Sequence, residues 1–331
     1  MDPARHQPDQ QPAAPPAQGV RLAWDAVPET LRLQAESYLA GRVVGAVTQP
    51  GGFSPGAAAR LRLADGRRAF AKAVGPELNP DSPGIYRAEA RIATRLPVTV
   101  PAPRLLTSFE DGGWVMLLFE DIDGHSPAQP WIPGELDRVL DAVAMLAEEL
   151  TPAPAGIGAP TVTERFGDDF RGWRHLAAAH DDGDDLSGLD PWARRNLSRL
   201  AGLESGWELA ARGGALVHAD LRADNLLLTG DKVYVVDWPW ACTAQPWFDL
   251  VAMLPSIGMQ GGPDPEKICR VHPVTRAAHP DAITAVLAAI TGYFIDRSRQ
   301  PPPPGLPTVR RFQLAQGQIA LGWLRQRTRW R

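Results

Sequence analysis

Leu216-Val-His-Ala-Asp-Leu-Arg-Ala-Asp-Asn225 is the most informative part of the sequence, and Val235-Val-Asp237 follows it along the chain. Two short apolar runs, 226–228 and 233–236, lie after Asn225. Apolar runs this short, bounded by turn residues, are typical of buried strands. The sequence therefore predicts a polar loop that leads into a strand, with a further acidic residue at the end of the next strand.

The residue types in this stretch suit phosphoryl transfer. Such a reaction needs an acceptor hydroxyl held in line and metal ions that neutralise the phosphate oxygens. Asp220 could orient the hydroxyl and take its proton, while Asn225 and Asp237 could hold Mg²⁺ through oxygen ligands. Their spacing, five and then twelve residues, matches the kinase pattern H-x-D-x-x-x-x-N followed by an Asp after a strand. The alternative is a plain polar loop whose Asp and Asn residues serve turns.

On these motifs and on Trp247-Phe-Asp249-Leu250, the sequence resembles the aminoglycoside phosphotransferases and choline kinase-like enzymes, which are small-molecule relatives of protein kinases. The resemblance covers residues 42–258. It implies an α+β, bilobal, protein kinase-like fold with a small β-rich N-lobe and a larger, mainly α C-lobe. It also implies a catalytic role for Asp220 and metal ligation by Asn225 and Asp237.

The same resemblance implies that His218 and Asp249 brace the catalytic loop from behind. The sequence departs from the family pattern at Ala219, where the family often has Gly, and at Pro239, where many members have an acidic residue. Both departures concern the geometry of the loop. The C-terminal region carries no pattern that matches the family, which leaves the acceptor open.

The motifs expected upstream occur in the family's order. Gly51, Gly52 and Ser54 lie in a Gly/Pro-rich loop between two predicted strands, where exposed N–H groups can bind phosphates. Lys72 stands between apolar neighbours in the third strand, and a buried lysine needs a counter-charge. By analogy with the kinase Lys–Glu pair, Glu89 on the following helix is the expected partner. An ordinary turn, a surface lysine and a solvated glutamate are the alternatives.

Glu120 and Ile122 follow the fifth strand at the expected junction of the lobes. In the family this hinge binds adenine through its main chain, so the resemblance assigns their backbone groups, and not their side chains, to the nucleotide. It implies MgATP between the lobes, with GTP as the alternative nucleotide. A simple linker is the other interpretation of these residues.

Length and composition agree with two lobes. The 331 residues carry a net charge of −4, which weighs against a nucleic-acid binder.

Residues 1–19 are rich in Pro, Gln and Ala and predict a disordered tail without a secretory signal. The lobes are then 20–120 and 121–331. The apolar stretch 282–295 is too short to cross a bilayer. Two cysteines make no disulfide framework, and a cytoplasmic location is the simplest expectation.

Hydrophobic periodicity and turn signals predict the elements. In the N-lobe they predict strands at 42–49, 57–64, 67–74, 104–109 and 114–119, with helices at 30–40, capped by Thr30, and at 85–96. In the C-lobe they predict helices at 136–150, 163–179, 191–212, 249–257, 281–295 and 308–325.

The residues after the second acidic motif favour a compact acceptor. Trp-Pro-Trp follows Asp237, and Asp249 comes only twelve positions later. This leaves little room for the long activation loop of a protein kinase, so a hydroxyl of a small molecule is the expected target.

An acidic segment points to the kind of acceptor. Residues 163–190 contain eight acidic and three basic side chains, and an acidic cleft would attract a polycationic aminosugar. Asp168 and Asp169 are the best candidates because they fall on a predicted helix; Trp238 and Asp249 are the other two. The bland interpretation is a solvated acidic loop and core tryptophans. Choline, homoserine, a sugar, a macrolide or a biosynthetic intermediate stay open as acceptors, as does a nucleotide-binding scaffold without transfer activity.

Overall fold

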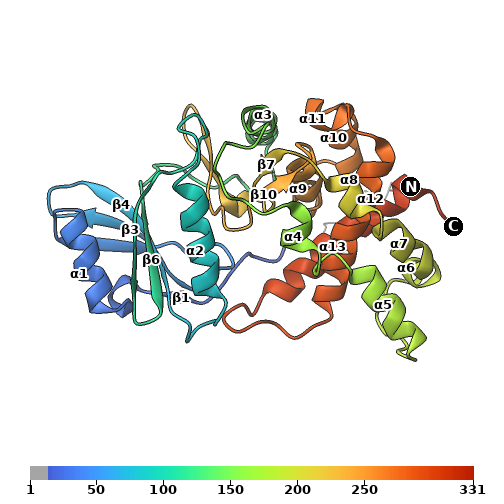
Figure 1. Cartoon of the computed structure of the whole chain (residues 1–331), viewed down its shortest axis with the longest axis horizontal. Helices are drawn as coiled ribbons and strands as arrows, with labels where there is room; N and C mark the ends of the chain where they lie inside the picture. The colour runs from blue at the N-terminus through green and yellow to red at the C-terminus, as the bar shows by residue number, and fades with distance from the viewer. Residues whose placement is uncertain (1–13) are drawn as a thin grey trace, which may run out of the picture.

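A twisted sheet forms the first lobe of the computed structural model, which describes residues 14–331 (Figure 1). Five strands lie in the order β1-β3-β4-β6-β5, and β2 pairs with β3. All neighbours are antiparallel except β1 and β3, which are parallel. The strands are β1 (Arg21–Leu22), β2 (Val43–Thr48), β3 (Gly56–Leu63), β4 (Arg68–Val74), β5 (Leu105–Asp111) and β6 (Trp114–Phe119).

The alternation of side chains along the strands places a helix on each face of this sheet. Met116 and Leu118 pack into the cluster that contains α1 (Glu29–Tyr38), whereas Leu117 packs with Tyr86 of α2 (Ser82–Ala93). Successive side chains of a strand point to opposite faces, and Figure 1 shows the two helices on opposite sides of β6.

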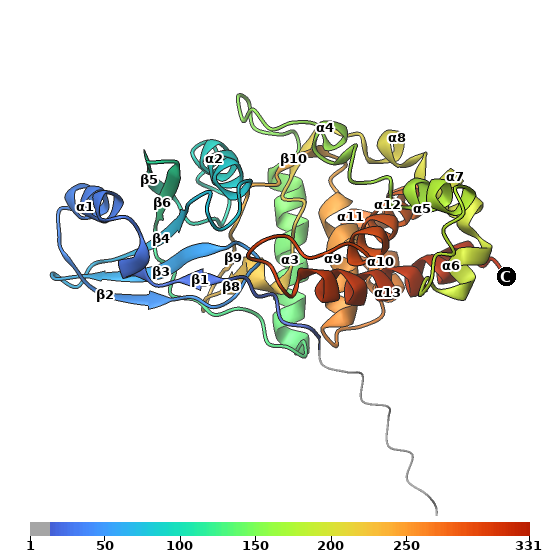
Figure 2. The same cartoon turned by 90° about the horizontal axis from the view of Figure 1, so that it is seen from below.

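The second lobe is mainly helical (Figure 2). It carries two small β-pairs, β7 with β10 and β8 with β9. Its large apolar core joins α12 to α13, α5 and α8. Its helices are α3 (Pro133–Glu149), α4 (Val162–Phe166), α5 (Gly172–Asp181), α6 (Pro191–Arg195), α7 (Leu197–Glu204), α8 (Trp207–Ala211), α9 (Phe248–Met259), α10 (Pro265–Val271), α11 (Pro273–Arg276), α12 (Pro280–Ser298) and α13 (Val309–Thr328). Its strands are β7 (Ala215–Val217), β8 (Leu226–Leu228), β9 (Val233–Val235) and β10 (Cys242–Ala244), and short 3₁₀ turns occur at Trp24–Ala26 and Ala223–Asn225.

The predicted α+β fold is confirmed, but two predicted helices are broken in the structure. The stretch 163–179 forms α4 and α5, and 191–212 forms α6, α7 and α8. Gly167 ends α4, and Gly206 separates α7 from α8; glycine in a helix interior costs about 1 kcal/mol relative to alanine. Asp168 and Asp169 therefore lie in a turn, and their predicted place on a helix is wrong. Thr30 does not cap α1, which begins at Glu29 after Pro28.

The predicted tail, residues 1–19, lies mostly outside the described residues. The described part includes main-chain hydrogen bonds from Gly52 N–H to Ala17 O (3.0 Å) and from Gly19 N–H to Gly52 O (2.9 Å). This stretch is therefore hydrogen-bonded to the glycine-rich loop through its main chain. The prediction of disorder rested on the lack of apolar side chains, which main-chain hydrogen bonds do not need. Among residues 14–331, no helix is long and apolar enough to cross a membrane.

Candidate active site

The loop after β7 carries His218, Ala219 and Asp220 and is fixed from behind by α9. Asp249, in the first turn of α9, accepts hydrogen bonds from the main-chain N–H groups of His218 (2.8 Å) and Ala219 (2.7 Å). Ala219 has a φ of +65°, a left-handed conformation that favours glycine. Alanine is therefore strained at this position, and the two hydrogen bonds to Asp249 hold the turn in place.

His218 is completely buried and supports the loop as a neutral ring. Its Nε2 donates to Val236 O (2.9 Å), and its Nδ1 accepts from the Asp220 N–H (3.2 Å). Burial lowers the pKa of His218 to about 4, so the ring is uncharged near neutral pH. Trp238 packs edge-on against it, with ring centroids 4.8 Å apart.

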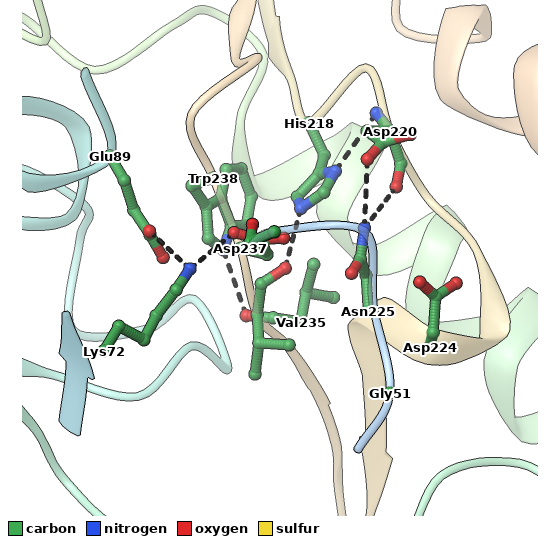
Figure 3. Close-up of polar contacts among 12 residues, drawn as sticks. Gly51, Lys72, Glu89, His218, Asp220, Asp224, Asn225, Val235, Asp237 and Trp238 are labelled. Carbon is green, nitrogen blue, oxygen red and sulfur yellow. Dashed lines mark hydrogen bonds and ion pairs between the residues drawn. The ribbon is translucent and has the colours of Figure 1, made fainter. Parts of the chain in front are cut away.

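Asp220 points from this loop toward Asn225 (Figure 3). Its carboxylate accepts from the Arg222 guanidinium and from Asn225 Nδ2 (3.3 Å). Burial raises the pKa of Asp220 to about 7, against the opposing charge of Arg222. A carboxylate with a pKa near the working pH is suited to taking a proton from a hydroxyl.

Arg222 links two carboxylates of the loop. It also donates from Nε and Nη2 to the two oxygens of Asp224, each at 3.0 Å. Burial opposes the charge of Arg222, but Asp220 and Asp224 outweigh it and raise its pKa. A two-pronged pair of this kind fixes geometry as well as charge, so it holds Asp220 in place.

Lys72 lies between the two lobes with carboxylates on either side (Figure 3). Its Nζ is 2.6 Å from Glu89 Oε2 on α2 and 2.6 Å from Asp237 Oδ1. Its neighbours Ala71 and Ala73 face the α1 side of the sheet, so Lys72 faces α2. Burial disfavours the ammonium, but Asp237 and Glu89 together raise the pKa of Lys72.

Asn225 and Asp237 provide oxygen atoms for a metal ion. Asn225 donates from Nδ2 to Asp220 O (2.8 Å), which leaves its Oδ1 as an acceptor, and Asp237 keeps Oδ2 beyond the Lys72 contact. No group of three His, Cys, Asp or Glu side chains within residues 14–331 could enclose a metal by itself. Two oxygen donors fit Mg²⁺, which takes its remaining ligands from water and substrate phosphates.

A cavity of about 420 Å³ lies next to these residues, beneath the glycine-rich loop. Gly51, Gly52 and Ser54 line it together with Lys72. Gly52 has a φ of +87°, and a Cβ on Gly56 would lie 2.4 Å from Ala73 O. The loop therefore requires glycine at both positions, which lets the main chain approach a ligand closely.

The far end of this cavity is the hinge between the lobes. The Glu120 carbonyl and the Ile122 N–H form no hydrogen bond with other residues of the stretch 14–331, although the Ile122 carbonyl accepts from Arg60 (2.9 Å). Asp121 is buried and pairs with Arg60 (2.7 Å) and Arg68 (3.1 Å). The hinge thus has one main-chain acceptor and one main-chain donor that no other described residue uses.

A second cavity, of about 460 Å³, opens on the other side of Asp237, which lines both. Asp220 faces this cavity, and nine aromatic side chains contribute to its wall, Phe166, Trp240 and Tyr293 among them. Of the predicted acceptor residues, only Asp169 lines it, and it pairs with Arg297.

The other three predicted acceptor residues lie elsewhere. The Asp168 side chain is fully exposed and lies 3.7 Å from Arg171. Trp238 lines the first cavity and donates from Nε1 to Val235 O (3.0 Å), and Asp249 lies behind the loop.

Comparison with known protein families agrees with this geometry. Residues 50–270, two-thirds of the chain, match the model of the phosphotransferase enzyme family (APH). This chain belongs to that family. No curated protein matches its sequence.

Solved structures share the fold of this phosphotransferase at low sequence identity. A thermostable mutant of aminoglycoside phosphotransferase APH(4)-Ia, in a ternary complex with AMP-PNP and hygromycin B, has a TM-score of 0.60, with 14% identity over 90% of this chain and 98% of its own. The GDP complex of aminoglycoside 2'-phosphotransferase-IIIa also has a TM-score of 0.60, with 14% identity over 90% and 96%. Choline kinase LicA from Streptococcus pneumoniae has a TM-score of 0.52, with 14% identity over 88% and 98%.

Sequence reasoning missed several residues of the phosphotransferase site. Arg222 and Asp224 lie within the quoted motif, where two charges beside a catalytic aspartate were the available signal. Arg60 and Asp121 join the hinge to the sheet, but their pairing across 61 positions left no local pattern. Arg21 contacts the carbonyls of the glycine-rich loop from a strand that carries no recognisable motif.

Proposed function

We propose that this phosphotransferase moves the γ-phosphoryl group of ATP to a hydroxyl of a small molecule in a magnesium-dependent reaction. The observation that carries the proposal is that Asp237 lines both cavities while Asp220 lines the second. A nucleotide in the first cavity and an acceptor in the second would meet at these two carboxylates. In-line transfer between bound partners needs this juxtaposition.

The N-lobe supplies the nucleotide-binding groups in this proposal. The Glu120 carbonyl and Ile122 N–H hold the base, with ATP as the nucleotide and GTP as the alternative. The loop around Gly51 covers the phosphates. Lys72 contacts them while Glu89 keeps the ammonium in place.

The C-lobe supplies the reacting end. Asn225 and Asp237 would hold Mg²⁺, which neutralises charge on the phosphate oxygens when bound. Asp220 orients the acceptor hydroxyl and takes its proton, while Arg222 and Asn225 fix the carboxylate. His218 and Asp249 act on Asp220 through the main chain of the loop, as positioning residues.

The acceptor has two candidates. The acidic segment favours an aminosugar, and Asp169 is the residue that would receive its ammonium group. The cavity itself favours a neutral acceptor with apolar rings, such as a macrolide. Its aromatic wall suits ring stacking, and its inner carboxylates, Asp169, Asp220 and Asp237, each have a cationic partner already. We also propose a cytoplasmic location, because the reaction consumes ATP.

The direct test is ADP release with MgATP, or GDP release with MgGTP, over aminoglycosides, macrolides, amino alcohols and sugars. Mass spectrometry identifies a product heavier by one phosphoryl group, and Asp220→Ala is the control. Asp169→Asn separates the acceptors: it should abolish use of an aminosugar and leave a neutral ring acceptor nearly unaffected. Nucleotide binding without transfer to any acceptor would favour the scaffold instead.

A further inference from the structure

Arg21, the first residue of β1, brings an unpaired positive charge to the nucleotide cavity. It lines that cavity together with Lys72 and Asp237. Its terminal nitrogens donate to the main-chain carbonyls of Gly51 and Ser54, and its buried Nε has no partner. No carboxylate of residues 14–331 forms an ion pair with it, although several lie nearby.

The main chain around Arg21 is fixed from both lobes. Gly56 N–H donates to Val20 O (3.1 Å), and Val20 N–H donates to Gly305 O (3.0 Å) in the connector between α12 and α13. Thr308 Oγ1 donates to Gln18 O (2.9 Å). The side chain therefore starts from an anchored strand beside β3 (Figure 2), and its place under the loop follows from the fold.

Around Asp237 and Asp220, negatively charged side chains outnumber positively charged ones. Lys72 contacts Glu89 and Asp237, and Arg222 contacts Asp220 and Asp224, so two cations face four carboxylates. A nucleoside triphosphate would add further negative charge there. Within the described chain, Arg21 is the cation of this region whose charge is not already balanced. Burial lowers its pKa, while the charges of Asp237 and Asp224 favour its ionised form.

We propose that Arg21 binds the phosphates of the nucleotide, exchanging the carbonyls of Gly51 and Ser54 for phosphate oxygens. A planar guanidinium matches two oxygens of one phosphate. The exchange would also release the glycine-rich loop to settle onto the ligand. This inference rests on the proposed nucleotide-dependent reaction and assigns the N-terminal strand a direct part in it.

The test is calorimetric binding of MgATP, MgADP and adenosine to the full chain and to Arg21→Gln. We expect the variant to bind ATP at least tenfold more weakly than the unaltered chain, because the lost contact is to phosphate. The affinity for ADP should fall less, and the affinity for adenosine should change less than about twofold. Arg62→Gln is the matched control, since Arg62 lies exposed on β3 outside both cavities. Thermal unfolding without ligand checks that both variants fold.

Two outcomes would overturn this inference. Unchanged ATP affinity would show that Arg21 only supports the loop carbonyls, and equal losses for ATP and adenosine would show a structural role in shaping the whole cavity. If Arg21→Gln does not fold, Arg21→Lys takes its place. Lysine keeps the charge but lacks the paired N–H donors of the guanidinium, so the affinity for ATP should still fall more than the affinity for adenosine. Failure of the unaltered chain to bind ATP would instead remove the proposed function, and this inference with it.

Discussion

The two cavities on either side of Asp237 are similar in size but differ in the elements that line them. The nucleotide cavity, about 420 Å³, is lined by glycines of the loop, residues of the hinge, charged groups and apolar side chains such as Phe70 and Phe119. The acceptor cavity, about 460 Å³, is walled by aromatic side chains from separate elements. Under the proposed function, the first would hold the nucleotide, whose phosphates are the same for every acceptor, and the second would hold the acceptor. The residues that carry phosphoryl transfer can therefore be recognised by their spacing in the sequence, whereas the residues that would select the acceptor cannot.

Removal of Asp220 should have the largest effect and should divide the two cavities cleanly. We expect Asp220→Ala to lower turnover by at least about 10³-fold, because the hydroxyl loses its proton acceptor and its alignment. MgATP affinity should change by less than about threefold, since Asp220 does not line the nucleotide cavity. Steady-state kinetics and calorimetry measure the two quantities. A variant that keeps most of its turnover would contradict the assigned role.

The pH dependence of turnover should report the same carboxylate. Because burial raises the pKa of Asp220 to about 7, the group becomes protonated as the pH falls below that value and no longer accepts a proton. We expect turnover at saturating substrates to fall about tenfold per pH unit below pH 7 and to level off above it. The weak residual rate of Asp220→Asn should lack this limb. An unchanged limb in that variant would assign the titration to another group.

The nucleotide side of this comparison could be predicted from the sequence, and most of the acceptor side could not. Lys72 and Glu89 meet as expected because strand alternation and the position of α2 bring them together. The contact of Lys72 with Asp237 was not predicted. Most N-lobe strands were also predicted closely, since Asp65-Gly66 and Asp111-Gly112 mark their hairpins. These signals are local. The ion pair between Asp169 and Arg297 could not be predicted, because Arg297 lies on a helix far along the chain.

A change in the aromatic wall should affect the acceptor alone. Trp240 is half-buried, lines the acceptor cavity and forms no hydrogen bond within residues 14–331. We expect Trp240→Leu to raise the KM for the identified acceptor about tenfold through lost ring contact, with MgATP affinity unchanged. Trp114→Leu, a half-buried tryptophan in the sheet lobe outside both cavities, is the control. An equal loss of ATP affinity in Trp240→Leu would mean that the cavities are not independent.

The smallest effect tests the loop that joins the two cavities. Ala219 holds a φ of +65°, where a Cβ costs roughly 1–2 kcal/mol, and glycine would remove that strain. Glycine also gives the unfolded chain more freedom, which costs roughly 0.4–1 kcal/mol. We therefore expect Ala219→Gly to raise the free energy of unfolding by about 0.5–1 kcal/mol, measured by urea denaturation.

The control is Ala210→Gly, inside α8, which should lower the free energy of unfolding by about 1 kcal/mol. Because Asp249 fixes the loop through main-chain N–H groups that glycine also has, turnover should change less than about twofold. A destabilised Ala219→Gly would mean that the methyl group packs in the acceptor wall more strongly than the backbone is strained.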